Sequence, residues 1–140
     1  MRSLSAAFAA ACLLATPAIA GDVSPLHGLP PLPATGDTPA MATLGEKLFF
    51  DRRLSVNGTM SCGLCHIPAQ GFAATELRTP VGIEGKSLRR NAPTLLNVAF
   101  YQRLFLDGRS QSLEAQAWEP MLAATEMGNA TADAVVSRVA

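Results

Sequence analysis

The stretch Cys62-Gly63-Leu64-Cys65-His66 decides how this chain is interpreted. Two cysteines separated by two residues and followed at once by a histidine form the C-x-x-C-H pattern that attaches a c-type haem. Both thiols can add to the vinyl groups of one macrocycle, and the adjacent imidazole then ligates its iron as the proximal ligand. A redox-active or structural Cys-x-x-Cys with an unrelated histidine is the alternative. The pattern predicts one covalent haem c, held by Cys62 and Cys65, with His66 as the iron ligand.

The first twenty residues are typical of a secretory signal peptide. Arg2 supplies the positive start, residues 6–14 an apolar stretch, and Ala18-Ile19-Ala20 a small-residue cleavage site. The apolar stretch is too short to cross a bilayer as a helix. Cleavage would remove Cys12 and leave only the two cysteines of the haem motif. We therefore expect an exported, periplasmic protein without membrane attachment, in a compartment that permits thiol chemistry.

The composition indicates the fold class and excludes some classes of partner. Eleven basic residues balance eleven acidic ones, so nothing favours nucleic acid or an anionic membrane surface as a partner. Residues 21–40 are rich in proline and glycine and predict an extended leader. We expect residues 41–140 to form one small domain. Its expected fold is mainly α, a cytochrome c-like helical domain around one haem, with long loops and little or no sheet.

Apolar spacing predicts a helix and a loop around the motif. A helix begins near Met41 and ends at Asp51, with Leu48 and Phe49 on its apolar face. The haem motif follows on a short helix. Residues 67–90 have no helical period because glycines and prolines interrupt them, and long irregular segments of this kind often cover a functional site.

Two further helices are predicted toward the end of the sequence. Ser112 is the expected N-cap of a helix that runs to about Thr125, and Pro120 should kink this helix. Thr131 is the expected N-cap of a last helix, which reaches the end of the sequence without a stop signal. We therefore expect the chain to be a fragment, truncated at its C-terminus.

Five further motifs accompany the haem motif in a fixed order. They are Leu44-Gly45-Glu46-Lys47-Leu48-Phe49-Phe50-Asp51, Arg53-Leu54-Ser55, Asn91-Ala92-Pro93-Thr94-Leu95-Leu96-Asn97, Asp107-Gly108-Arg109 and Glu126-Met127-Gly128. With them the chain resembles the N-terminal haem domain of the bacterial dihaem cytochrome c peroxidases, a family shared by the methylamine-utilisation dihaem enzymes. The resemblance spans about residues 44–128. It implies an oxidoreductase that, when complete, reduces hydrogen peroxide at the His66-ligated haem.

The resemblance also assigns residues to the distal side of the haem. It places Gln116, Pro120 and Glu126 there, with Pro120 as a contact of the cofactor and Glu126 as the acid–base residue. A carboxylate over the open iron face can take a proton from one peroxide oxygen and return it to the other. Gln116 can hydrogen-bond the developing charge. Without the resemblance, Glu126 and Gln116 would be interpreted as solvated helix residues.

The chain departs from the family pattern in three respects. Many family peroxidases carry a second histidine in the loop after the haem motif, where it ligates the resting haem. Residues 67–90 contain no histidine, and Gly82 falls about where it would lie. The resemblance then implies a five-coordinate iron that is open without reductive activation, as in the methylamine-utilisation branch. Leu106 replaces a tryptophan on the route between the haems, and the sequence has no second Cys-x-x-Cys-His.

The resemblance implies partners and a second metal. The partners are hydrogen peroxide as substrate and, as electron source, either a small periplasmic donor (cytochrome c or a cupredoxin) or a second haem domain. Asn91 matches a position that ligates calcium in the family, although calcium prefers six to eight oxygen ligands. The alternative is that Asn91 caps a turn before Pro93.

Two other interpretations stay open. In a monohaem electron carrier, Met127 would be the sixth ligand, since a methionine thioether raises the potential of a His/Met haem. A haemless exported helical domain is the third interpretation. The flanking of Met127 by Glu126 and Gly128 favours the peroxidase domain, whereas turnover by the isolated chain stays an open question.

Overall fold

The computed structural model describes residues 28–140. The chain divides into two units, Met1–Pro31 and Leu32–Ala140, and the predicted signal peptide and His27 lie outside the described residues. Residues 32–38 are exposed and form neither helix nor strand, and the leader expected over residues 21–40 stays a prediction. Among the described residues, no helix has the length and apolar character needed to span a membrane.

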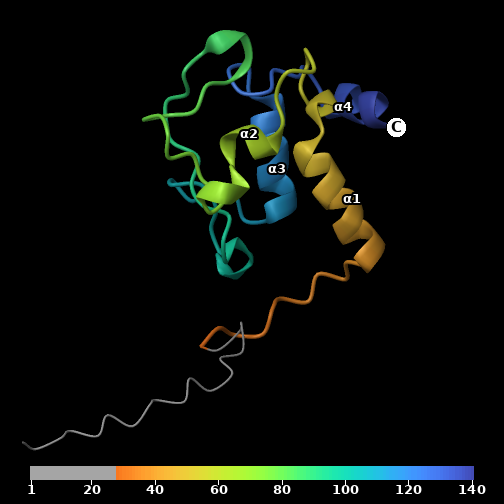
Figure 1. The fold of residues 1–140 in the computed structure, drawn as a ribbon. Coiled ribbons are helices and arrows are strands. Elements are labelled where there is room, and N and C mark those ends of the chain that lie inside the picture. Colours follow the sequence, from red (N-terminus) through yellow and green to blue (C-terminus); the bar gives the residue numbers. More distant parts are fainter. Residues whose placement is uncertain (1–27) are drawn as a thin grey trace, which may run out of the picture. The chain divides into compact units, whose positions relative to one another are not determined.

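The second unit contains four α-helices joined by long loops (Figure 1). The helices are α1 (Pro39–Phe50), α2 (Cys62–Cys65), α3 (Leu113–Leu122) and α4 (Ala132–Val139). Four short 3₁₀ turns lie between them: η1 (Arg52–Leu54), η2 (Pro68–Gln70), η3 (Ile83–Gly85) and η4 (Val98–Phe100). Residues 28–140 form no strand, only three isolated antiparallel bridges. The predicted mainly helical fold with little or no sheet is therefore confirmed.

Capping residues fix where three of the helices begin. Thr38, Ser112 and Thr131 each accept, through the side-chain oxygen, a hydrogen bond from the backbone N–H three residues on, at 3.1–3.2 Å. The N-caps predicted at Ser112 and Thr131 are confirmed. Helix α1 begins at Pro39, before the predicted Met41, because Thr38 supplies the cap and proline suits the first helical position.

Helix α3 ends at Leu122, earlier than the predicted Thr125. The chain turns back after Ala123, so that the N–H groups of Met127 and Gly128 donate to the carbonyls of Pro120 and Ala123 at 3.2 and 3.0 Å. These bonds use the carbonyls that a longer helix would need for its own next turn. Pro120 lies in the last turn of α3, and the kink predicted there stays a prediction.

The hydrophobic core lies where η1, α4 and the turn after α3 meet. Leu54, Met127 and Val135 are buried there, with exposed fractions of 6, 5 and 1%. Partly buried apolar side chains pack around these three: Leu48, Met60, Trp118, Met121 and Val139. Figure 1 shows α4 beside η1 at one end of α1, while the loops between α2 and α3 lie on the other side. The core thus packs η1, which comes early in the domain's sequence, against α4, which ends it. Helix α2 lies beside the loops.

Asn129 connects three elements of this core, although no sequence pattern predicted it. Its side chain is 3% exposed. The amide N–H₂ donates to the carbonyls of Leu54 and Met121 at 2.8 and 2.7 Å, and the amide oxygen accepts from Arg138. One buried amide therefore satisfies backbone groups of η1 and α3 and fixes a side chain of α4.

We expect Asn129→Leu to lower the free energy of unfolding by about 2–4 kcal/mol, because two buried carbonyls lose their donors. Urea unfolding of the haem-loaded protein, followed by circular dichroism, measures the difference. Gln102→Ala, at an exposed loop position, is the control and should leave the midpoint unchanged. Equal midpoints for the two variants would contradict the connecting role of Asn129.

Candidate haem site and distal pocket

Helix α2 presents both cysteines of the haem motif on a single turn. Cys62 and Cys65 are three residues apart and therefore share one face. Both are half-buried free thiols. Burial raises the pKa of each thiol above its usual range, and the nearby Glu126 carboxylate raises that of Cys65 further. The two sulfurs are therefore neutral thiols at neutral pH.

Gly63, between the cysteines, allows α2 to lie against α1. A Cβ at this position would lie 2.6 Å from Cδ1 of Phe50 and 3.5 Å from Cε1 of Phe49. The two phenylalanine rings meet edge to face, with their centroids 5.0 Å apart. Because real Cβ atoms do not approach a ring so closely, a side chain at the first position between the two cysteines would have to displace the Phe50 ring.

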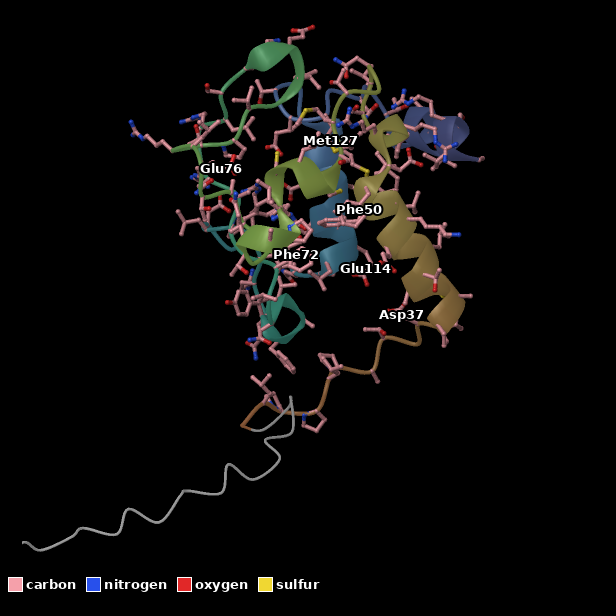
Figure 2. The ribbon with its side chains drawn as sticks, viewed as in Figure 1. Asp37, Phe50, Phe72, Glu76, Glu114 and Met127 are labelled. Carbon is pink, nitrogen blue, oxygen red and sulfur yellow. The ribbon has the colours of Figure 1, made fainter. Side chains whose placement is uncertain are left out.

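An apolar hollow of about 550 Å³ opens beside the motif. It is lined by Gly45, Glu46, Phe49, Phe50, Pro68 and Phe72. The rings of Phe49 and Phe72 lie 6.0 Å apart between centroids, and Phe50 and Phe72 are labelled in Figure 2. Since Phe50 contacts Gly63 and the Phe72 carbonyl contacts His66, this hollow borders the Cys-x-x-Cys-His turn.

The imidazole of His66 is oriented by two backbone carbonyls. Its Nδ1 lies 3.0 Å from the carbonyl oxygen of Phe72 and 3.1 Å from that of Pro93. A carbonyl oxygen can only accept, so Nδ1 carries the hydrogen and Nε2 keeps its lone pair. This is the tautomer that ligates a metal through Nε2, with the second ring nitrogen held by an acceptor.

Asn91 and Thr94 hold the loop that supplies the Pro93 carbonyl. The Asn91 amide donates to the carbonyl of Ala74 at 2.7 Å and accepts from the N–H of Ala92 at 2.9 Å. The Thr94 hydroxyl donates to the carbonyl of Gly71. Asn91 therefore bridges two loop segments, as in the turn-capping alternative, and the calcium predicted at this residue stays a prediction.

These residues fit a covalently attached haem. Two free thiols lie on one turn, an adjacent imidazole has its Nε2 lone pair available, and an apolar hollow is lined by Phe50 and Phe72, which contact Gly63 and His66 of the motif. Thiols for thioether bonds, a proximal histidine and an apolar surface are what a c-type haem requires of a protein.

The residues predicted for the distal side lie on α3 and on the turn that follows it. Gln116 and Pro120 are four residues apart in α3 and share one face of the helix. Glu126 follows in the turn, and the bond from the N–H of Met127 to the Pro120 carbonyl holds this turn against the helix end. All three side chains are partly exposed. The structure thus brings Glu126 to the end of α3 that carries Pro120, while Gln116 lies one turn earlier in the helix.

The carboxylate of Glu126 is half-buried and forms no hydrogen bond within residues 28–140. Burial raises the pKa of this carboxyl above its usual range, while the guanidinium of Arg109 opposes the rise. Glu126 is therefore near the haem motif, free of partners, and has a pKa shifted toward neutral pH. These are the properties of a group that can accept and return a proton.

Arg109 is a site residue that sequence reasoning missed, although its Asp-Gly-Arg motif was noticed. Its guanidinium donates to Glu119 at 2.7 Å and to Asp107 at 2.9 Å. It also lies 3.4 Å above the ring centroid of Phe105. The neighbouring Leu106 is 89% exposed. The motif therefore fixes a positive charge whose field reaches Glu126.

Met127 is part of the hydrophobic core. It is 5% exposed and packs with Leu54 and Val135. A thioether engaged in this core would have to leave it in order to ligate an iron beside α2. The packing therefore favours a structural role for Met127 over the sixth-ligand role of the electron-carrier interpretation.

Comparisons with known proteins agree with this site. The family model for di-haem cytochrome c peroxidase matches residues 39–140. A cytochrome-c peroxidase, IdrP1, of Denitromonas iodatirespirans is 43% identical over 119 residues, which are 81% of this chain and 31% of the relative. The methylamine utilization protein MauG of Methylorubrum extorquens is 44% identical over 102 residues, 73% of this chain and 28% of the relative.

A solved structure shows the same fold. The diheme peroxidase BthA from Burkholderia thailandensis superposes with a TM-score of 0.67 at 36% sequence identity. The superposition covers 73% of this chain and 30% of that chain. The present chain thus spans about three-tenths of the length of the relatives it matches.

Proposed function

Because the chain belongs to the di-haem cytochrome c peroxidase family, we propose that it is the domain at which hydrogen peroxide reacts. In this proposal one haem c is bonded to Cys62 and Cys65 and is ligated by Nε2 of His66. The tautomer set by the Phe72 and Pro93 carbonyls supports this ligation. When bound, the haem supplies the iron and the redox chemistry for cleavage of the peroxide O–O bond.

Glu126 and Gln116 carry the proton chemistry in this proposal. The Glu126 carboxylate accepts the proton of one peroxide oxygen and returns it to the other, so that the departing oxygen leaves as water. The Gln116 amide donates a hydrogen bond to the charge that develops on the departing oxygen. Pro120 contributes an apolar contact beside them. The half-buried Glu126 carboxylate, which has no hydrogen-bond partner in the described residues, is the observation that carries the proposal.

We also propose that the iron is five-coordinate in the resting protein. His66 is the single histidine of residues 28–140, and the loop of residues 67–90, with Gly82 in it, offers no second imidazole to the iron. Met127, the best candidate for a sixth ligand, packs in the core, and the poorer candidates Met60 and Met121 pack against it. This packing supports an open distal side.

A visible absorption spectrum tests the proposal, with the chain produced alongside the cytochrome c maturation machinery. We expect a high-spin ferric haem whose spectrum changes when hydrogen peroxide is added. A low-spin His/Met spectrum that is inert to peroxide would overturn the proposal in favour of an electron carrier. The absence of a Soret band would show that no haem is bound and would support the interpretation as a haemless helical domain.

The cellular setting follows from the same proposal. Residues 1–20 act as a cleaved signal peptide, and the product is periplasmic. Its electrons come from a second haem domain, or from a small cytochrome c or cupredoxin. The chain spans about three-tenths of the length of these relatives.

The calcium assignment of Asn91 can be separated from its bridging role. We expect Asn91→Ala and Asn91→Asp each to lower the free energy of unfolding by about 1 kcal/mol, because both lose the donor to the Ala74 carbonyl. In thermal unfolding, the two variants should lose the same stability, and adding a calcium chelator should not change that loss. If Asn91→Asp keeps a calcium-dependent stability that Asn91→Ala lacks, calcium ligation is the main role of Asn91.

A further inference from the structure

Residues 81–87 form a small closed loop that packs on the turn carrying Glu126. An antiparallel bridge joins Val81 to Ser87 at the base of the loop. Inside it, the N–H of Gly82 donates to the carbonyl of Lys86 at 2.8 Å. These backbone contacts close the loop and fix the positions of Gly82 and Ile83, the two residues that contact the Glu126 turn.

Gly82 lies directly against the backbone of the Glu126 turn. A Cβ at residue 82 would overlap the carbonyl oxygen of Thr125, and would lie 2.9 Å from its carbonyl carbon and 3.1 Å from Cα of Glu126. The φ angle of Gly82 is −90°, which other residues adopt without strain. Close approach of two backbones, and not an unusual dihedral angle, is therefore what requires glycine here.

Ile83 makes the second contact between the loop and the turn. Its N–H donates to the carbonyl of Glu126 at 3.0 Å. Its side chain is 6% exposed and occupies the space above Gly128, where a Cβ would overlap Cδ1 of Ile83. Gly128 has a φ of +71°, so conformation and space both favour glycine at that position. One glycine on each side thus lets the loop and the turn meet.

We propose that Gly82 and Ile83 are positioning residues that hold Glu126 in place for its proton transfer. The inference rests on the acid–base role proposed for Glu126. The carboxylate has no hydrogen bond of its own within residues 28–140, so its place is set by the backbone that carries it. At Glu126 itself, the N–H is held by Ala123 at 3.0 Å and the carbonyl by Ile83. Any side chain at residue 82 must displace either the loop or this backbone.

The test is a double-mutant cycle between residues 82 and 126 in the haem-loaded protein. Stopped-flow absorbance gives the rate constant of the ferric haem with hydrogen peroxide. We expect Gly82→Ala to lower this rate constant by about 10–100-fold, because small misplacements of a catalytic group have effects of this size. In the Glu126→Gln background the same substitution should change the rate less than about twofold, because residues acting through one group are not additive.

Gln102→Ala, at an exposed loop position, is the control and should leave the rate constant unchanged. An equal loss from Gly82→Ala in both backgrounds would show a general structural defect and overturn the positioning role. A wild-type rate constant in Glu126→Gln would instead remove the proposed function of Glu126, and the positioning role with it. These two failures are therefore distinguishable.

Ile83→Ala keeps the test decisive if Gly82→Ala does not retain haem. This variant preserves the N–H bond to Glu126 and removes only the side chain above Gly128. We expect a loss of about 3–10-fold in the peroxide rate constant, an unchanged resting spectrum, and again no further loss in the Glu126→Gln background. A wild-type rate constant, or a loss that is additive with Glu126→Gln, would overturn the proposal.

Discussion

Glu126→Gln is expected to slow the reaction of the haem-loaded protein with hydrogen peroxide by about 10²–10⁴-fold, the usual contribution of a positioned acid–base group. Glutamine has nearly the same shape and keeps the hydrogen-bonding capacity, but it cannot accept the proton of the peroxide. Stopped-flow measurement of the rate constant tests this, together with the resting spectrum and the haem content, which should both be unchanged. Glu114→Gln, at an exposed position in the first turn of α3, is the matched control and should react normally.

The pH dependence gives the same prediction a second readout. The carboxyl must be ionised to accept a proton, so the rate should fall as the pH is lowered through the pKa of Glu126. Burial raises that pKa above the ordinary value of 4.5, so the midpoint of the fall should lie above pH 4.5. The Glu126→Gln variant should lack this acid limb. An identical acid limb in the variant would assign the titration to another group and remove Glu126 from its role.

Complete loss of covalently bound haem is expected when both cysteines of α2 are replaced by alanine. Each thioether bond needs one thiol, and the described residues hold no other free cysteine that could substitute for Cys62 or Cys65. Haem staining after denaturing electrophoresis measures the bonded haem directly. Each single variant retains one possible thioether bond and should therefore keep some stain.

His66→Gly is the control that separates attachment from ligation. Both thiols remain in this variant, so haem should stay bonded to the chain, while the iron loses its proximal ligand. Added imidazole should restore the original spectrum, because it can enter the space left by the side chain. Haem stain in the double alanine variant, or its loss from His66→Gly, would contradict the assignment of the three residues.

The sequence predicts the parts of the site that depend on short spacings. The Cys-x-x-Cys-His turn, the N-caps at Ser112 and Thr131, and the common face of Gln116 and Pro120 all follow from residues within four positions of each other. Local chemistry determines these features, because a cap or a helix face involves a single turn of the chain.

The remaining features depend on partners that are distant in the sequence. Pro93 accepts a bond from His66 across 27 residues, and Asn129 donates to Leu54 across 75. Gly82 requires glycine only because the backbone of Thr125 passes over it. No periodicity or capping pattern reports such contacts, since they exist only after the loops have been placed. The early end of α3 is a more local effect, because it reflects bonds from Met127 and Gly128 to Pro120 and Ala123.

The loop between Ile83 and Pro93 links the two sides of the haem site in one folding unit. The contact of Pro93 with His66 closes one long chain segment, and the contact of Ile83 with Glu126 closes another. The two closed segments share residues 83–93. Once one contact has ordered this stretch, the other contact forms without a second loss of its conformational entropy. Formation of either contact therefore makes the other easier to form. We expect the proximal and distal sides to open together in hydrogen exchange, as one cooperative unit.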